Sequence, residues 1–166
     1  MNGFPVSRRV LIAAAVALLP ALLHAANAAA AKPAHDAAPI DFYAVQNAPP
    51  GMNLPFSEAV RAGDMLYLAG MLGTDASGKL VAGGIKTEAK QTMDNISANL
   101  TRHGASLDRV VQCTVALADM ADWPAFNDVY RGYFKEHFPA RMAYGAGALA
   151  LGARVEVQCN AYVGGS

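Results

Sequence analysis

The sequence predicts an α+β fold, a mixed β-sheet with two helices on one face and the element order ββαβαββ. Short runs of alternating apolar and polar residues, bounded by turn signals, predict the strands. Two longer segments whose apolar residues recur at helical spacing predict the helices. With 166 residues, the chain has room for one domain of ordinary size and an appendage. Strands and helices in this order should form a sheet covered by one helical layer.

The first half of the domain should contain a hairpin followed by a helix. Residues 57–61 and 65–70 are short β-type runs, and Ala-Gly-Asp at residues 62–64 is a hairpin signal between them. Farther along, apolar side chains recur at helical spacing until Gly104. The first helix should therefore cover residues 85–103.

The second half should contain a strand, a helix and two final strands. A β-type run at residues 109–118 leads into an acidic turn, and Asp122 is the predicted N-cap of the second helix. Aromatic side chains give this helix a broad apolar face, which should pack on the sheet rather than bind an aromatic ligand. Strands at residues 140–149 and 153–163 complete the domain.

The N-terminal segment has the composition of a secretion signal. Residues 1–9 carry two arginines and no acid, residues 10–23 are apolar, and Ala26-Asn27-Ala28 has the form of a signal peptidase site. We therefore expect residues 1–28 to be a cleaved signal peptide. Because the apolar run has only fourteen residues, an uncleaved membrane anchor is the weaker alternative.

The sequence also predicts where the protein goes and where its domain begins. Residues 7–12, Ser-Arg-Arg-Val-Leu-Ile, resemble the twin-arginine export motif, so we expect export, with the periplasm as the destination. Residues 29–52 are rich in Ala and Pro and lack periodicity, which predicts a flexible tether. The folded domain should then occupy residues 53–166.

The charge distribution argues against nucleic acid as a partner. Removal of the signal would leave eleven basic and thirteen acidic side chains, a net charge of −2. Binding a polyanion needs a basic stripe that releases counterions, whereas the basic residues here are scattered among acids. These scattered residues are Lys79, Lys86, Lys90, Arg102 and Arg109.

Two cysteines, Cys113 and Cys159, remain in what should be an oxidising compartment. Each lies in a β-type run in phase with valines, which favours two buried free thiols over a disulfide. Their spacing is unlike that of a zinc site, and we expect no metal.

Residues 138–163 place the charged side chains of Arg141 and Glu156 within apolar, strand-like runs. The planar guanidinium of Arg141 suits a carboxylate, so at the edge of an apolar pocket it indicates capture of a small acidic ligand. Glu156 alternates with Val155 and Val157 and should therefore point to the face opposite the valines. The alternative is that Arg141 and Glu156 pair with each other or lie at the surface.

Several motifs resemble those of the Rid family (RidA/YjgF), the reactive intermediate deaminases that older usage calls L-PSP endoribonucleases. Pro139-Ala140-Arg141 and Val155-Glu156-Val157 resemble its C-terminal signature, residues 55–60 and 66–70 resemble its opening hairpin, and the likeness covers residues 53–163. The resemblance implies a fold similar to chorismate mutase of the Bacillus type. It also implies a homotrimer whose sheets line a central barrel, with pockets at the clefts between subunits.

The resemblance further implies hydrolysis of short 2-imino acids, which arise from enamines such as 2-aminoacrylate, to 2-keto acids and ammonia without a cofactor. Arg141 would hold the substrate carboxylate, while Glu156 would orient or deprotonate the attacking water and pass a proton to the leaving nitrogen. Backbone groups near Gly70 and Ala143 would fix the imine. Asn127 matches a family position near the cleft.

Three residues depart from the family pattern. Phe56 stands where a tyrosine is usual, Ala69 where a serine is common, and Ala143 where a cysteine is frequent. Each change removes a polar group from the pocket, which favours a substrate more apolar than alanine-type imines. Two alternatives belong to other functional classes: a non-catalytic protein that binds small carboxylates through Arg141, and a holdase-type protective protein that uses exposed apolar surface.

Overall fold

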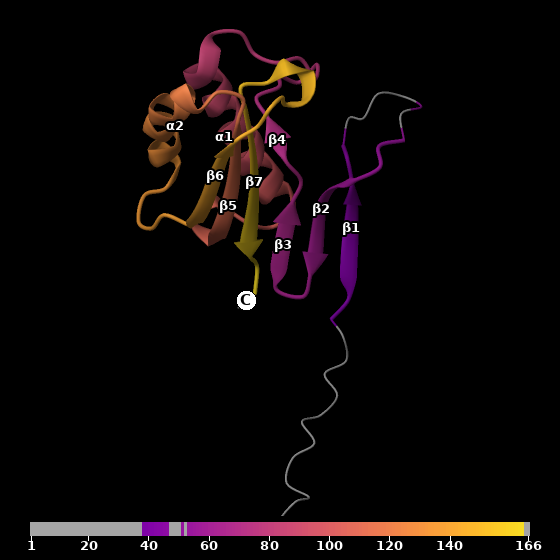
Figure 1. Cartoon of the computed structure of the whole chain (residues 1–166). Helices are drawn as coiled ribbons and strands as arrows, with labels where there is room; N and C mark the ends of the chain where they lie inside the picture. Colours follow the sequence, from indigo (N-terminus) through magenta and orange to yellow (C-terminus); the bar gives the residue numbers. More distant parts are fainter. Residues whose placement is uncertain (1–37, 47–50, 52, 165–166) are drawn as a thin grey trace, which may run out of the picture. The chain divides into compact units, whose positions relative to one another are not determined.

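The computed structural model describes residues 38–46, 51 and 53–164, which form a mixed β-sheet with the helices on one face (Figure 1). The α+β class predicted from the sequence is confirmed. Neither helix in these residues is long and apolar enough to cross a membrane. The strands are β1 (Ile40–Ala44), β2 (Ser57–Ala62), β3 (Met65–Leu68), β4 (Met71–Leu72), β5 (Val110–Leu117), β6 (Ala140–Gly145) and β7 (Val155–Tyr162), and the helices are α1 (Gly84–Arg102) and α2 (Trp123–Tyr130).

The sheet has the strand order β1-β2-β3-β7-β5-β6, and β4 also pairs with β7. β5 and β6 are parallel, whereas the other paired strands are antiparallel. A parallel pair requires a crossover connection, which here contains α2. The crossover leaves α2 beside β6 at one end of the sheet (Figure 1).

The predicted elements are present, but some of their ends differ. α1 begins and ends within one residue of its predicted limits, whereas β6 ends at Gly145 instead of residue 149. Asp122 is the N-cap residue of α2 as predicted, but its side chain makes no capping hydrogen bond. Its Oδ2 instead accepts a hydrogen bond of 2.9 Å from Nε of Arg154, since a charged donor competes well with a backbone amide.

The N-terminal edge of the sheet begins earlier than predicted. Residues 40–44 form β1, which pairs antiparallel with β2, so the prediction of a tether over residues 29–52 is wrong for these five residues. The short strand depends on its neighbours: the ring of Tyr43 lies 4.2 Å from that of His103 at the end of α1. The predicted signal peptide, residues 1–28, lies outside the described residues.

A buried carboxylate connects this edge to α1. The side chain of Glu58, only 8% exposed, accepts hydrogen bonds from the backbone N–H of Gln46 at 2.8 Å and from Nη1 of Arg102 at 3.2 Å. Nε2 of His103 lies 2.9 Å from Oε1 of the same carboxylate. A charge can be buried without a large penalty only when it is paired and hydrogen-bonded in this way.

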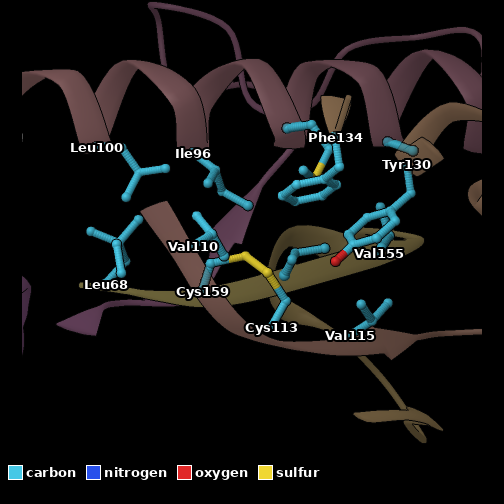
Figure 2. Close-up of a cluster of buried hydrophobic side chains, with 14 of the residues drawn as sticks. Leu68, Ile96, Leu100, Val110, Cys113, Val115, Tyr130, Phe134, Val155 and Cys159 are labelled. Atoms are coloured by element: carbon cyan, nitrogen blue, oxygen red, sulfur yellow. A yellow bond between two sulfur atoms is a disulfide. The ribbon is translucent and has the colours of Figure 1, made fainter. Parts of the chain in front are cut away.

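The core between the sheet and the helices contains a disulfide bond (Figure 2). Cys113 of β5 and Cys159 of β7 are register partners, both are fully buried, and their sulfur atoms are 2.04 Å apart. The prediction of two free thiols is therefore wrong. Each strand alone shows an inward-facing cysteine, but only the antiparallel register places the two opposite each other.

Reduction of this disulfide should destabilise the domain. The bond closes a loop between residues 46 positions apart, and loop-closure entropy then predicts a loss of about 3 to 4 kcal/mol in the free energy of unfolding. Urea unfolding with and without a thiol reductant measures the difference. A variant carrying both Cys113→Ala and Cys159→Ala is the control, because its unfolding should not respond to reductant. Equal midpoints for oxidised and reduced wild type would contradict the prediction.

Candidate functional site

Arg141 lies on β6 with its guanidinium held against aromatic rings of α2. Its Cζ is 4.6 Å from the ring centroid of Trp123, 4.5 Å from that of Tyr130 and 6.0 Å from that of Phe126. These three residues share one face of α2 because they are three and four positions apart. Cation–π attraction at such distances positions the guanidinium without neutralising its charge.

No carboxylate in the part of the chain that the structure describes pairs with Arg141. The predicted alternative of an Arg141–Glu156 ion pair is thus absent from these residues. The guanidinium also donates no hydrogen bond within residues 38–46 and 53–164. Its planar fork therefore remains available for an acidic ligand.

A cleft of about 480 Å³ opens beside this guanidinium. Asn127, one of the predicted site residues, lines it together with Arg141. Ala143 lies two residues farther along β6 on the face that carries Arg141, where it packs against the core. The complete lining consists of Asn127, Tyr130, Arg131, Phe138, Pro139 and Arg141.

Tyr130 forms the boundary between this cleft and the core. Its ring is buried, and its hydroxyl has no hydrogen-bond partner among the described residues. Burial raises the pKa of Tyr130 from 10.0 to about 12, because the phenolate would lose its hydration, while the nearby positive charge of Arg141 opposes this rise.

Glu156 lies against Gly70. Its register partners are Leu72 of β4 and Ala116 of β5, and its carboxylate occupies the space in which a side chain at position 70 would lie. A Cβ atom at Gly70 would overlap Oε1 of Glu156. Only glycine permits this close approach, so the backbone at Gly70 and the carboxylate form one unit.

Gly70 also shares a second cleft, of about 300 Å³, with Phe56. The ring of Phe56 is 54% exposed, so it lies at the mouth of this cleft rather than in the core. Glu58 and its partner Arg102, the ion pair described above, line the same cleft. The hairpin therefore places three predicted features, Phe56, Gly70 and Glu156, close to one another.

Within one chain, however, Arg141 and Glu156 lie on opposite faces of the sheet. Arg141 is the register partner of Cys113, whose side chain is in the core beneath the helices. Glu156 alternates with the buried Val155 and Val157, so its carboxylate points to the uncovered face. The structure thus divides the predicted site into an arginine group and a glutamate group.

Comparison with known proteins identifies the family. The protein family described as Endoribonuclease L-PSP matches residues 45–163. This chain belongs to that family. The resemblance to the Rid family seen in the sequence motifs is thereby confirmed.

Members of the L-PSP family with known names or structures resemble the whole domain. A 2-iminobutanoate/2-iminopropanoate deaminase of Capra hircus is 48% identical over 111 residues, which are 66% of this chain and 81% of the goat protein. The crystal structure of yeast Mmf1 matches with a TM-score of 0.69 and 31% identity, over 76% of this chain and 100% of that one. The structure of E. coli TdcF with bound serine matches with a TM-score of 0.65 and 25% identity, over 74% and 98% of the two chains.

Sequence reasoning missed the partners of the site residues in this L-PSP family member. The aromatic residues of α2 were interpreted as core, whereas Trp123 and Tyr130 also hold Arg141. The spacing of these rings along one face of α2 can be read from the sequence. The sequence does not show which residue of the sheet packs against them. The ion pair between the buried Glu58 and Arg102 was also missed, because 44 residues separate them.

The raised pKa of Tyr130 predicts a loss of stability in alkali. The folded chain keeps this proton up to about pH 12, whereas an unfolded tyrosine loses it near pH 10, so the free energy of unfolding should fall as the pH rises through this window. Urea unfolding at about pH 9 and about pH 11 measures the fall. Tyr130→Phe should reduce it, because this substitution removes the titrating hydroxyl. Identical pH dependence in wild type and Tyr130→Phe would refute the assignment.

Proposed function

We propose that this chain hydrolyses short 2-imino acids to 2-keto acids and ammonia. The observation that supports this most directly is the unpaired guanidinium of Arg141, which aromatic rings hold at the edge of a cleft. The goat relative is named a deaminase of 2-iminobutanoate and 2-iminopropanoate, both of which carry a carboxylate next to the imine. The serine bound to E. coli TdcF carries a carboxylate as well.

Arg141 binds the substrate carboxylate in this proposal. A guanidinium whose orientation is already fixed loses little side-chain entropy on binding, and its two parallel N–H donors match the two carboxylate oxygens. The carbon of the imine is then held at a fixed distance from the arginine. Positioning of this kind supplies a large part of the rate acceleration when the chemistry itself is simple.

Glu156 acts on the attacking water. Its carboxylate accepts a proton from the water as the oxygen adds to the imine carbon, and passes that proton to the nitrogen to give a carbinolamine. The hydroxyl proton of the carbinolamine then moves to the nitrogen, which leaves as ammonia while the carbonyl forms. Gly70 permits the carboxylate to lie directly against the backbone, so a substrate on that backbone would be within reach of the acid. The reaction consumes one water and requires no redox partner.

The two groups can act on one substrate only if two chains contribute to each site. We therefore propose a homotrimer in which the Arg141 group of one chain meets the Glu156 group of the next. Large side chains on the uncovered sheet face support such an assembly, since they are exposed in the single chain. They are Tyr67, Met142, Tyr144 and Tyr162.

The cross-strand disulfide supports the predicted export. Disulfides persist in oxidising compartments such as the periplasm and are rare in the cytosol. The bond between Cys113 and Cys159 is buried in the core, where it serves stability rather than chemistry. We propose that the deaminase acts outside the cytoplasm.

Replacement of Arg141 should abolish hydrolysis while the fold persists. Loss of two charge-assisted hydrogen bonds predicts a fall in kcat/KM of about 100-fold or more for Arg141→Ala, and Arg141→Lys should recover little because an ammonium lacks the fork. The assay follows 2-imino acids generated in situ, and circular dichroism checks the fold. Lys79→Ala, a change at an exposed residue outside both clefts, is the control. Full activity of Arg141→Ala would show that the carboxylate binds elsewhere.

A site shared between chains should be restored by mixing two inactive variants. Trimers assembled at random from equal amounts of Arg141→Ala and Glu156→Gln chains would contain about a quarter of intact sites, because the two functional side chains come from neighbouring chains. Co-expression with two affinity tags yields the mixed assembly, and light scattering reports its size. If both residues of a site came from one chain, every site would carry one mutation and activity would stay absent. A stable monomer would contradict the trimer.

A further inference from the structure

A second cation lines the cleft beside Arg141. Arg131 lies directly after α2, at the start of the 310 turn Arg131–Tyr133, and its exposed side chain borders the same cleft. Among the described residues, no acidic side chain lines this cleft and no carboxylate pairs with Arg131. The cleft therefore combines two guanidinium groups with the amide of Asn127 and apolar walls.

The acidic residues closest to Arg131 in the sequence lie elsewhere. Asp128, three positions before it on the helix, forms an ion pair of 3.3 Å with Lys86 of α1. Glu136, five positions after it, lines a different cleft, near Leu107. Arg131 is well placed to interact with the carbonyl end of α2, but any cation at this helix end would do so. The helix dipole therefore does not explain why the side chain borders the cleft.

Two guanidinium groups line one cleft, and neither is paired with a carboxylate of the residues that the structure describes, which favours a ligand with two carboxylates. In the proposed trimer, Glu156 of the next chain acts on the imine, so the second cation remains available for a distal carboxylate. Each guanidinium offers the paired donors that a carboxylate accepts. Phe138 and Pro139 supply an apolar wall suited to a short methylene chain between two carboxylates.

We infer that the cleft selects 2-imino dicarboxylic acids of four or five carbons. Arg141 holds the carboxylate next to the imine, and Arg131 holds the distal one. This assignment rests on the proposed deaminase function and names its substrate class. It departs from the sequence-based expectation of a more apolar substrate, because that expectation considered Phe56, Ala69 and Ala143 but not Arg131. Water adds to the imine carbon, the nitrogen leaves as ammonia, and the product is a 2-keto dicarboxylic acid whose distal carboxylate is unchanged.

Kinetics with two imines test the inference. An amino-acid oxidase converts aspartate into the four-carbon imino diacid in situ, and a second oxidase converts 2-aminobutanoate into a monoacid of equal chain length. Arg131→Ala should lower kcat/KM for the diacid at least about tenfold more than for the monoacid, because only the diacid reaches the distal cation. Lys135→Ala removes an equal charge at the neighbouring cleft and should leave this ratio unchanged. An unchanged ratio in Arg131→Ala would overturn the inference.

A binding measurement separates this inference from the proposed activity. Calorimetry with succinate and butanoate, which have equal chain length, requires no turnover. Wild type should bind succinate at least about tenfold more tightly than butanoate, and Arg131→Ala should lose this preference. Hydrolysis of the monoacid imine without a succinate preference would refute the diacid site alone. A succinate preference without hydrolysis of either imine would refute the deaminase function and leave the two-cation site in place.

Discussion

The pairing of β5 with β7 is the constraint on which the rest of the structure depends. It sets the register that joins Cys113 to Cys159 and turns Val155 and Val157 into the core. The same register fixes Glu156 opposite Ala116 and beside β4. A shift of one residue would exchange the faces of β7, burying the carboxylate and exposing the valines. The stability of the core and the position of the candidate acid therefore have one cause.

The separation of Arg141 from Glu156 follows from strand geometry alone. Side chains alternate between the faces of a sheet, and the registers of β5 with β6 and β7 assign these two residues to opposite faces. The helical face supplies aromatic rings that orient a cation. The uncovered face carries the carboxylate of Glu156, which lies directly against the backbone of Gly70. A single domain thus displays two halves of a site, which makes association of chains a requirement of the proposed chemistry.

The sequence was sufficient for the parts of the fold that local patterns determine. The hairpin, both helices and the final strands were predicted because their periodicity lies within short windows. The errors concern contacts between distant segments. Asp122 is the predicted N-cap residue, but its carboxylate binds Arg154 instead of the helix N–H groups. Cys113 forms a disulfide with Cys159, a pairing that only the register of β5 with β7 reveals. The five residues of β1 show no strong strand periodicity in the sequence. They form a strand because they pair with β2, a contact that the sequence alone does not reveal.

The same reasoning applies to the candidate site. Arg141 and Glu156 were recognisable because they are charged residues within apolar strands. Gly70 was recognisable because it belongs to the hairpin motif that resembles the family. The stacking of Arg141 on Trp123 and the closeness of Gly70 to Glu156 depend on tertiary structure. Arg131 had no signal at all, since an arginine after a helix is common.

The place of β7 in the chain order has a consequence for biosynthesis. Among the strands that the structure describes, β7 is the last to leave the ribosome, and it lies between β3 and β5 in the finished sheet. Until it is synthesised, those two strands have unpaired edges, and the nascent chain cannot close its core. A premature stop that removes only the final strand would therefore cost the entire domain.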